Sequence, residues 1–105
     1  MTNLIAACMN ATSRNADATL LLYSIIERIE AGNVVQRDGH DWIAKSAADW
    51  CEAIGFSVRR YQRAIARLRQ LGLAVTEQHL HANRAITFVR LTEAGEKLVW
   101  WQGEA

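Results

Sequence analysis

The chain has 105 residues, half of them hydrophobic, and a net charge of only +1. This length and composition fit one small domain with a single core and leave little material for a second. The two cysteines lie far apart in the sequence, at positions 8 and 51, which excludes a disulfide-stapled scaffold. Because the opening residues lack the basic stretch and long apolar run of an export signal, we expect a cytoplasmic, nucleoid-associated protein.

The first third of the chain predicts two helices. Residues 3–10 are apolar enough for a short helix, and a longer helix should run from about Ala16 to Ala31, capped by Asn15 and stopped by Gly32. The apolar residues of this second helix cover more than one face. A single core would use only part of them, so we expect the others to form a dimer contact, namely Leu21, Tyr23 and Ile26.

The next segment predicts a hairpin or short strand around Trp42, followed by two short helices. Ser46 is a typical N-cap for the first of these helices, which should stop at Gly55. Ser57 then caps a second helix that should end at Gly72.

The last third predicts a β-hairpin and a closing helix. Residues 73–80 and 85–91 alternate apolar and polar side chains around a polar turn over residues 81–84. Thr92 should cap the closing helix, which carries the adjacent residues Trp100 and Trp101. Two neighbouring tryptophans cannot face the same core, so we expect this helix to contribute to the dimer contact as well.

The helix that begins after Ser57 carries the strongest functional signal. It has no acidic residue and five basic ones: Arg59, Arg60, Arg63, Arg67 and Arg69. Its apolar residues recur at helical spacing and predict one buried stripe: Tyr61, Ala64, Ile65, Leu68 and Leu71. Charge is segregated along the whole chain too, with −3 over residues 1–56, +6 over residues 57–90 and −2 over residues 91–105. Such a distribution indicates a polyanionic partner, although a solvated basic face would have the same composition.

From Trp42 to about residue 99 the sequence resembles the winged helix-turn-helix family, and is similar to the domains of small bacterial repressors and of phage and plasmid replication proteins. The turn GFS and the segments RLRQLGL and RLTEAGEKLV carry the resemblance. It implies an α+β, mostly helical fold, a winged helix-turn-helix with a C-terminal β-hairpin wing and flanking N- and C-terminal helices. The chain would form one domain over residues 1–105, with N-terminal helices in 1–31, the helix-turn-helix and wing in 42–91, and a C-terminal helix in 92–105.

The same resemblance implies roles for individual residues. Arg59, Arg60, Gln62 and Arg63 would lie on the exposed first turns of the recognition helix, in the major groove of DNA. From its position on the edge of the helix, rather than from the resemblance, Arg67 could reach a phosphate, while Arg69 could instead pair with an acidic residue elsewhere. The resemblance places His81, Asn83 and Arg84 at the wing tip, where they would contact the DNA backbone or minor groove. Ser46 and Ser57 lie at helix N-termini, where their hydroxyls could also donate to a phosphate.

These features predict a protein that binds double-stranded DNA sequence-specifically, as a homodimer, and acts by occupying its site. It would be a transcriptional repressor or a plasmid or phage replication or partition factor. The alternative is a winged-helix interaction module that docks an acidic protein. The sequence has no phosphate-binding loop, paired-carboxylate motif or nucleophile elbow, so we expect no enzyme and no small-molecule ligand or cofactor. His79 and His81 share a strand face but have no third ligand nearby in sequence, so we expect no metal site.

Overall fold

The computed structural model of the protein describes residues 4–81 and 84–97, apart from the side chains of residues 81 and 84. Eight elements follow one another along the chain: α1 (Leu4–Ala11), α2 (Ala16–Glu30), β1 (Val35–Arg37), β2 (His40–Lys45), α3 (Ala47–Ile54), α4 (Val58–Gln70), β3 (Ala74–His81) and β4 (Arg84–Leu91). A further helical segment occupies residues 93–97. No helix within the described ranges is long and apolar enough to cross a membrane.

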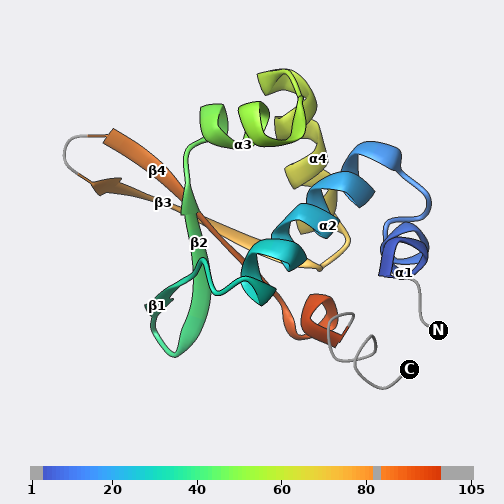
Figure 1. The fold of residues 1–105 in the computed structure, drawn as a ribbon, viewed down its shortest axis with the longest axis horizontal. Helices are drawn as coiled ribbons and strands as arrows, with labels where there is room; N and C mark the ends of the chain where they lie inside the picture. Colours follow the sequence, from blue (N-terminus) through green and yellow to red (C-terminus); the bar gives the residue numbers. More distant parts are fainter. Residues whose placement is uncertain (1–3, 82–83, 98–105) are drawn as a thin grey trace.

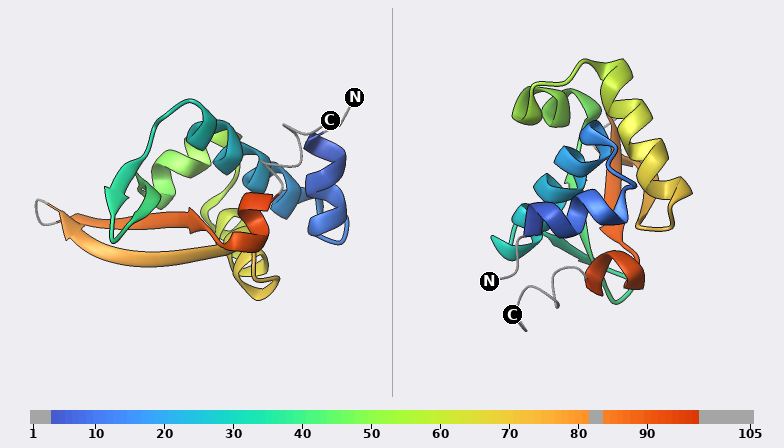
Figure 2. Two further views of the ribbon diagram at one scale, coloured as in Figure 1. Left: turned by 90° about the horizontal axis from the view of Figure 1, so that it is seen from below. Right: turned by 90° about the vertical axis from the view of Figure 1, so that its right-hand side faces the viewer.

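The strands form one antiparallel sheet in the order β1-β2-β4-β3, so β2 pairs with β4 across a helical insertion in the sequence. The helices α2, α3 and α4 gather at one end of the long hairpin β3–β4, whose other end projects past them (Figures 1 and 2). Val89 of β4 lies opposite Ile43 of β2 and Thr76 of β3. Since Val89 and Ile43 are buried, this side of the sheet is the one that faces the core.

Helix α2 is the centre of the core, because it packs against α1, α3, α4 and β2. Its fully buried side chains are Leu21, Leu22, Ile25 and Ile26. Our prediction that Leu21 and Ile26 form a dimer contact is therefore wrong. The apolar residues cover several faces of α2 because several elements of the same chain surround this helix, and a second chain is not needed to bury them. Tyr23 is half-buried against the same core, and Trp100 and Trp101 lie outside the described residues.

The helix boundaries follow the predicted capping residues. The side chains of Asn15, Ser46 and Ser57 each accept the backbone N–H three residues on, at 3.0, 3.1 and 3.2 Å. Each thereby satisfies one of the N–H groups that a helix leaves free at its start. Helix α3 ends before Gly55, as predicted.

Two hairpins build the sheet. In the first, Asp38 and Gly39 both have positive φ, 52° and 77°, which is the geometry of a two-residue turn between β1 and β2. The sequence left open whether this segment forms a hairpin or a short strand, and it forms a hairpin. The second hairpin pairs β3 with β4 from Ala74 opposite Leu91 to His81 opposite Arg84. Its turn is therefore shorter than predicted, because His81 and Arg84 belong to the strands.

Thr92 caps the segment 93–97, as predicted, and also ties it to the end of α4. Its hydroxyl donates to the carbonyl of Gly72 at 2.6 Å, and its backbone N–H donates to the carbonyl of Leu73 at 3.0 Å. The same hydroxyl accepts the N–H of Gly95 at 3.2 Å. Gly95 lies so close to the chain after α4 that a Cβ atom there would stand 2.5 Å from the Leu73 carbonyl oxygen.

Candidate nucleic-acid interface

Helix α4 buries one side and exposes the other. Tyr61, Ala64 and Leu68 lie in the core, spaced three and four residues apart. The exposed side begins at the N-terminus of the helix and carries Arg59, Gln62, Arg63, Ala66, Arg69 and Gln70. We call these six residues the exposed α4 face.

The exposed α4 face is positively charged and has no acidic residue of its own. Among the residues that the structure describes, Arg59, Arg63 and Arg69 form no ion pair. Arg69, which we considered as a partner for an acidic residue, is thus exposed and unpaired within this part of the chain. Three guanidinium groups on one helix side repel one another and favour binding of an anionic partner.

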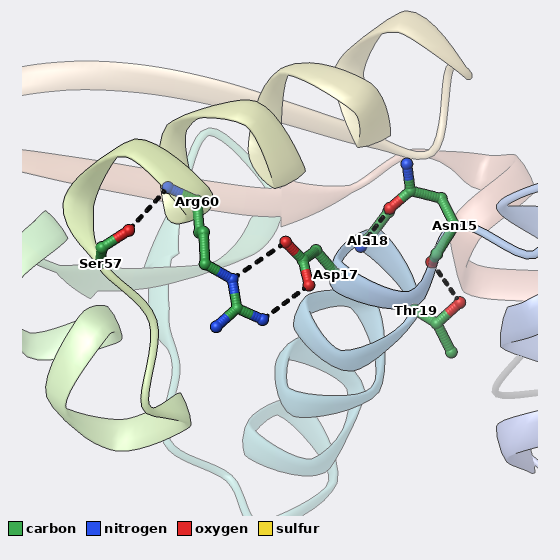
Figure 3. Close-up of polar contacts among 6 residues, drawn as sticks. All are labelled: Asn15, Asp17, Ala18, Thr19, Ser57 and Arg60. Carbon is green, nitrogen blue, oxygen red and sulfur yellow. Dashed lines mark hydrogen bonds and ion pairs between the residues drawn. The ribbon is translucent and has the colours of Figure 1, made fainter.

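Arg60 does not belong to this face, contrary to the prediction that it enters the groove. Its Nη2 and Nε atoms donate to the two carboxylate oxygens of Asp17 at 2.8 and 3.2 Å (Figure 3). Its guanidinium also stacks over the ring of Phe56, 4.2 Å from the centroid. Arg60 is therefore bound to its own chain, where it joins the start of α4 to the start of α2.

The hydrogen bonds from Arg60 lower the pKa of Asp17, with the charges of Arg60 and Arg63 acting in the same direction and partial burial opposing them. The same bonds raise the pKa of Arg60. Asp17 was missed in the sequence because it lies 43 residues from its partner. An acidic residue in the first turn of a helix is also favoured by the helix dipole, so its position alone does not indicate an arginine partner.

Arg67, predicted to contact a phosphate, is half-buried at the edge of the helix. Its Nη1 atom donates to Oε1 of Gln70 at 3.4 Å, while its buried Nε has no hydrogen-bond partner in the described chain. Arg67 is less free to turn outward than Arg59 or Arg63.

Ser46 and Ser57 mark the starts of α3 and α4, where both hydroxyls act as helix caps (Figure 3 shows Ser57). Next to Ser46, the Nζ atom of Lys45 lies 5.1 Å from the ring centroid of Trp50, and the guanidinium of Arg28 lies 5.4 Å from it. Burial, and then the nearby charge of Arg28, lower the pKa of Lys45. Arg28 and Lys45 are far apart in the sequence, so their proximity, which α2 and β2 create in the fold, was not predicted.

The side chains of His81 and Arg84 and the whole of Asn83 lie outside the described residues, so their predicted contacts at the hairpin tip stay predictions. The described part of the hairpin carries an aromatic cluster on the side away from the core. Phe88 makes edge-on contacts with Trp42 and His79, at 6.4 and 5.2 Å between ring centroids. Arg37 stacks on Phe88 and Arg90 on Trp42, at 5.0 and 5.3 Å. The alternation of apolar and polar residues predicted that the hairpin has two different faces. It did not predict that cationic side chains would cover the face away from the core.

Within the described residues, no three His, Cys, Asp or Glu side chains lie close enough together to bind a metal ion. Cys51 packs against the core from α3. Comparison of the chain with protein-family models, curated proteins and solved structures found no match.

Proposed function

We propose that the protein is a winged helix-turn-helix protein that binds double-stranded DNA, with α4 as its recognition helix and β3–β4 as its wing. The element order supports this proposal: α2, β2, α3 and α4 precede a hairpin whose second strand pairs with β2. The turn of Gly55, Phe56 and Ser57 between α3 and α4 is short, as in helix-turn-helix motifs.

The observation that carries the proposal is the exposed α4 face. Arg59, Gln62 and Arg63 lie on its first two turns, and none of the three is bound to another described side chain by a hydrogen bond or ion pair. An α-helix fits the major groove of DNA, where arginine binds the O6 and N7 atoms of guanine and glutamine binds adenine. The same charges would also attract an acidic protein. An acidic protein partner, however, would not require a glutamine between the arginines on the same helix face.

The chain would act by occupying its DNA site, as a repressor or as a plasmid or phage replication or partition factor. A two-fold dimer on an inverted repeat is part of the proposal, although its contact surface cannot include Leu21 or Ile26. Selection of bound duplexes from a random pool would identify the site, and half-sites about one helical turn apart would support the dimer. A single asymmetric site bound by one chain would contradict it.

The first test is Arg63→Ala, measured by fluorescence anisotropy on a duplex obtained from that selection. If Arg63 contacts a base, the variant should bind more weakly by about 1–3 kcal/mol and discriminate less at one position of the site. Lys97→Ala is the control, because it also removes one exposed positive charge but lies on the segment 93–97. It should leave the affinity nearly unchanged.

The test of the alternative uses the native chain and unrelated duplexes. Binding at 50 mM salt that falls steeply by 200 mM supports a DNA partner, because each neutralised phosphate releases counterions. The absence of binding even at 50 mM salt would contradict the proposal and favour an acidic protein partner.

A further inference from the structure

Asp17 places a negative charge at the border of the exposed α4 face. It belongs to the first turn of α2, and its side chain is 33% exposed, against 43% for that of Arg60. The pKa of Asp17 responds to the charge of Arg63 as well as to Arg60, which places the carboxylate within the field of both arginines. The carboxylate is therefore at the surface, beside the residues proposed to meet DNA.

Contacts within the chain orient the guanidinium of Arg60 toward Asp17. Two of its nitrogen atoms donate to the Asp17 carboxylate (Figure 3), and Phe56 covers one flat side of the guanidinium. The Nη1 atom of Arg60 does not bind Asp17, but a phosphate that approaches it also meets the Asp17 carboxylate, whose negative charge cancels that of the guanidinium. One of the five arginines of α4 is thus neutralised at the surface, while its neighbour Arg59 forms no ion pair with any described residue.

We propose that Asp17 masks Arg60 and so limits the binding of this protein to DNA of unrelated sequence. The inference rests on the proposed function. Contacts between arginine and phosphate are independent of base sequence and supply nearly all non-specific affinity. With Arg60 masked, the exposed α4 face keeps the arginine and glutamine side chains that can read bases, while the helix as a whole offers one phosphate-binding charge fewer.

The experiment measures the affinity for an unrelated duplex between 50 and 200 mM salt in four proteins: the native chain, Asp17→Asn, Arg60→Gln and the double variant. Asparagine keeps the size of Asp17 but cannot neutralise Arg60. Released Arg60 should then bind one more phosphate, which steepens the slope of log affinity against log salt by about 0.9. The affinity lost over this fourfold salt range should grow by about threefold, and Asp17→Asn should bind more tightly at 50 mM.

Arg60→Gln tests the mask from the other side. It leaves the Asp17 carboxylate unpaired beside the phosphates, so binding should weaken most at 50 mM salt, where this repulsion is least screened, while the slope changes by much less than about 0.9. The double variant removes both charges and should return to the native slope. A slope that falls by about 0.9 in Arg60→Gln would overturn the proposal, because Arg60 would then leave Asp17 and bind a phosphate in the native complex.

The matched control is Glu30→Gln, which removes one carboxylate from the exposed far end of α2, about 20 Å from Asp17 at 1.5 Å per residue. It should not steepen the slope. A steepening equal to that of Asp17→Asn would show that the effect comes from the change in net charge, and would overturn the proposal that Asp17 masks Arg60. Circular dichroism at the assay temperature checks that each variant is folded. If Asp17→Asn does not fold, the salt dependence of Arg60→Gln alone tests whether Asp17 masks Arg60.

The outcome also separates this inference from the proposed function. A native chain that fails to bind any duplex at 50 mM salt contradicts the proposed function. A native chain that binds, together with an Asp17→Asn variant of unchanged slope, contradicts only the mask.

Discussion

At the scale of single residues, Tyr61 is the side chain that anchors α4 beneath its charged face. It is 3% exposed, and its ring stacks on the ring of Trp50 at 6.4 Å between centroids. Burial, with a smaller contribution from Cys51, raises the pKa of its hydroxyl to about 12. The hydroxyl has no hydrogen-bond partner among the described residues, so its desolvation is not compensated there.

Tyr61→Phe should therefore keep the packing and remove the cost of the buried hydroxyl. We expect the free energy of unfolding in urea to stay level or to rise by up to about 1 kcal/mol. Tyr23→Phe, at a half-buried position of α2, is the control and should change stability by less than about 0.5 kcal/mol. A loss of more than about 1 kcal/mol in Tyr61→Phe would mean that the hydroxyl has a partner in solution.

At the scale of the elements, the end of α4 is held by the segment that follows the hairpin. The hydroxyl of Thr92 binds the carbonyl of Gly72, and Gly95 brings the segment 93–97 against Leu73. The close approach depends on glycine because any Cβ atom would overlap the Leu73 carbonyl oxygen. This joint fixes where α4 ends relative to the start of β3.

Gly95→Ala should break that approach. The added carbon would also come within 3.2 Å of Leu91, so the segment 93–97 must shift as a whole. We expect a loss of about 1–3 kcal/mol in the free energy of unfolding, as for other overpacked sites. Glu96→Ala, on the exposed side of the same segment, should cost less than about 0.5 kcal/mol. Equal stability of Gly95→Ala and the native chain would contradict the close contact.

At the scale of the whole molecule, the pair of Asp17 and Arg60 couples stability to pH. The folded chain lowers the pKa of Asp17 below its ordinary value of 3.8, so the folded state favours the carboxylate more than the unfolded state does. The stabilisation is fully present above that ordinary value and is lost as the pH falls through the lowered pKa.

Asp17→Asn removes this dependence. The difference in unfolding free energy between the native chain and the variant should be constant from pH 7 down to about 5 and should shrink as the pH falls below 3.8. Thermal unfolding followed by circular dichroism at several pH values measures it. A difference that grows on acidification would contradict the sign of the pKa shift. Glu30→Gln again serves as the control.

The helix starts and the long hairpin were predictable, because their signals are local. Asn15, Ser46 and Ser57 cap helices by contacts within three residues, and the strands β3 and β4 alternate apolar and polar side chains. The α+β fold is confirmed, whereas the winged-helix assignment is a proposal that the order of the elements supports.

The states of the arginines were not predictable, since each depends on what a distant element places beside it. Arg59 and Arg60 are neighbours of the same residue type, yet within the described ranges only Arg60 contacts a carboxylate, which α2 supplies. The burial of Leu21 likewise depends on the number of elements around α2, which the periodicity of one helix does not reveal. The predictions for Arg60 and Leu21 were wrong because both assumed that only solvent or a second chain could contact the side of a helix that faces away from the predicted core.

The joint at Gly72, Leu73 and Thr92 has a consequence for motion. Because it ties the end of α4 to the start of β3 and the end of β4, we expect the helix and the hairpin to move together. In the proposed complex with DNA, α4 and the hairpin would therefore contact the duplex at a fixed spacing from each other. A double helix whose grooves are spaced differently would have to bend to fit, so the shape of the DNA would contribute to selection alongside its bases.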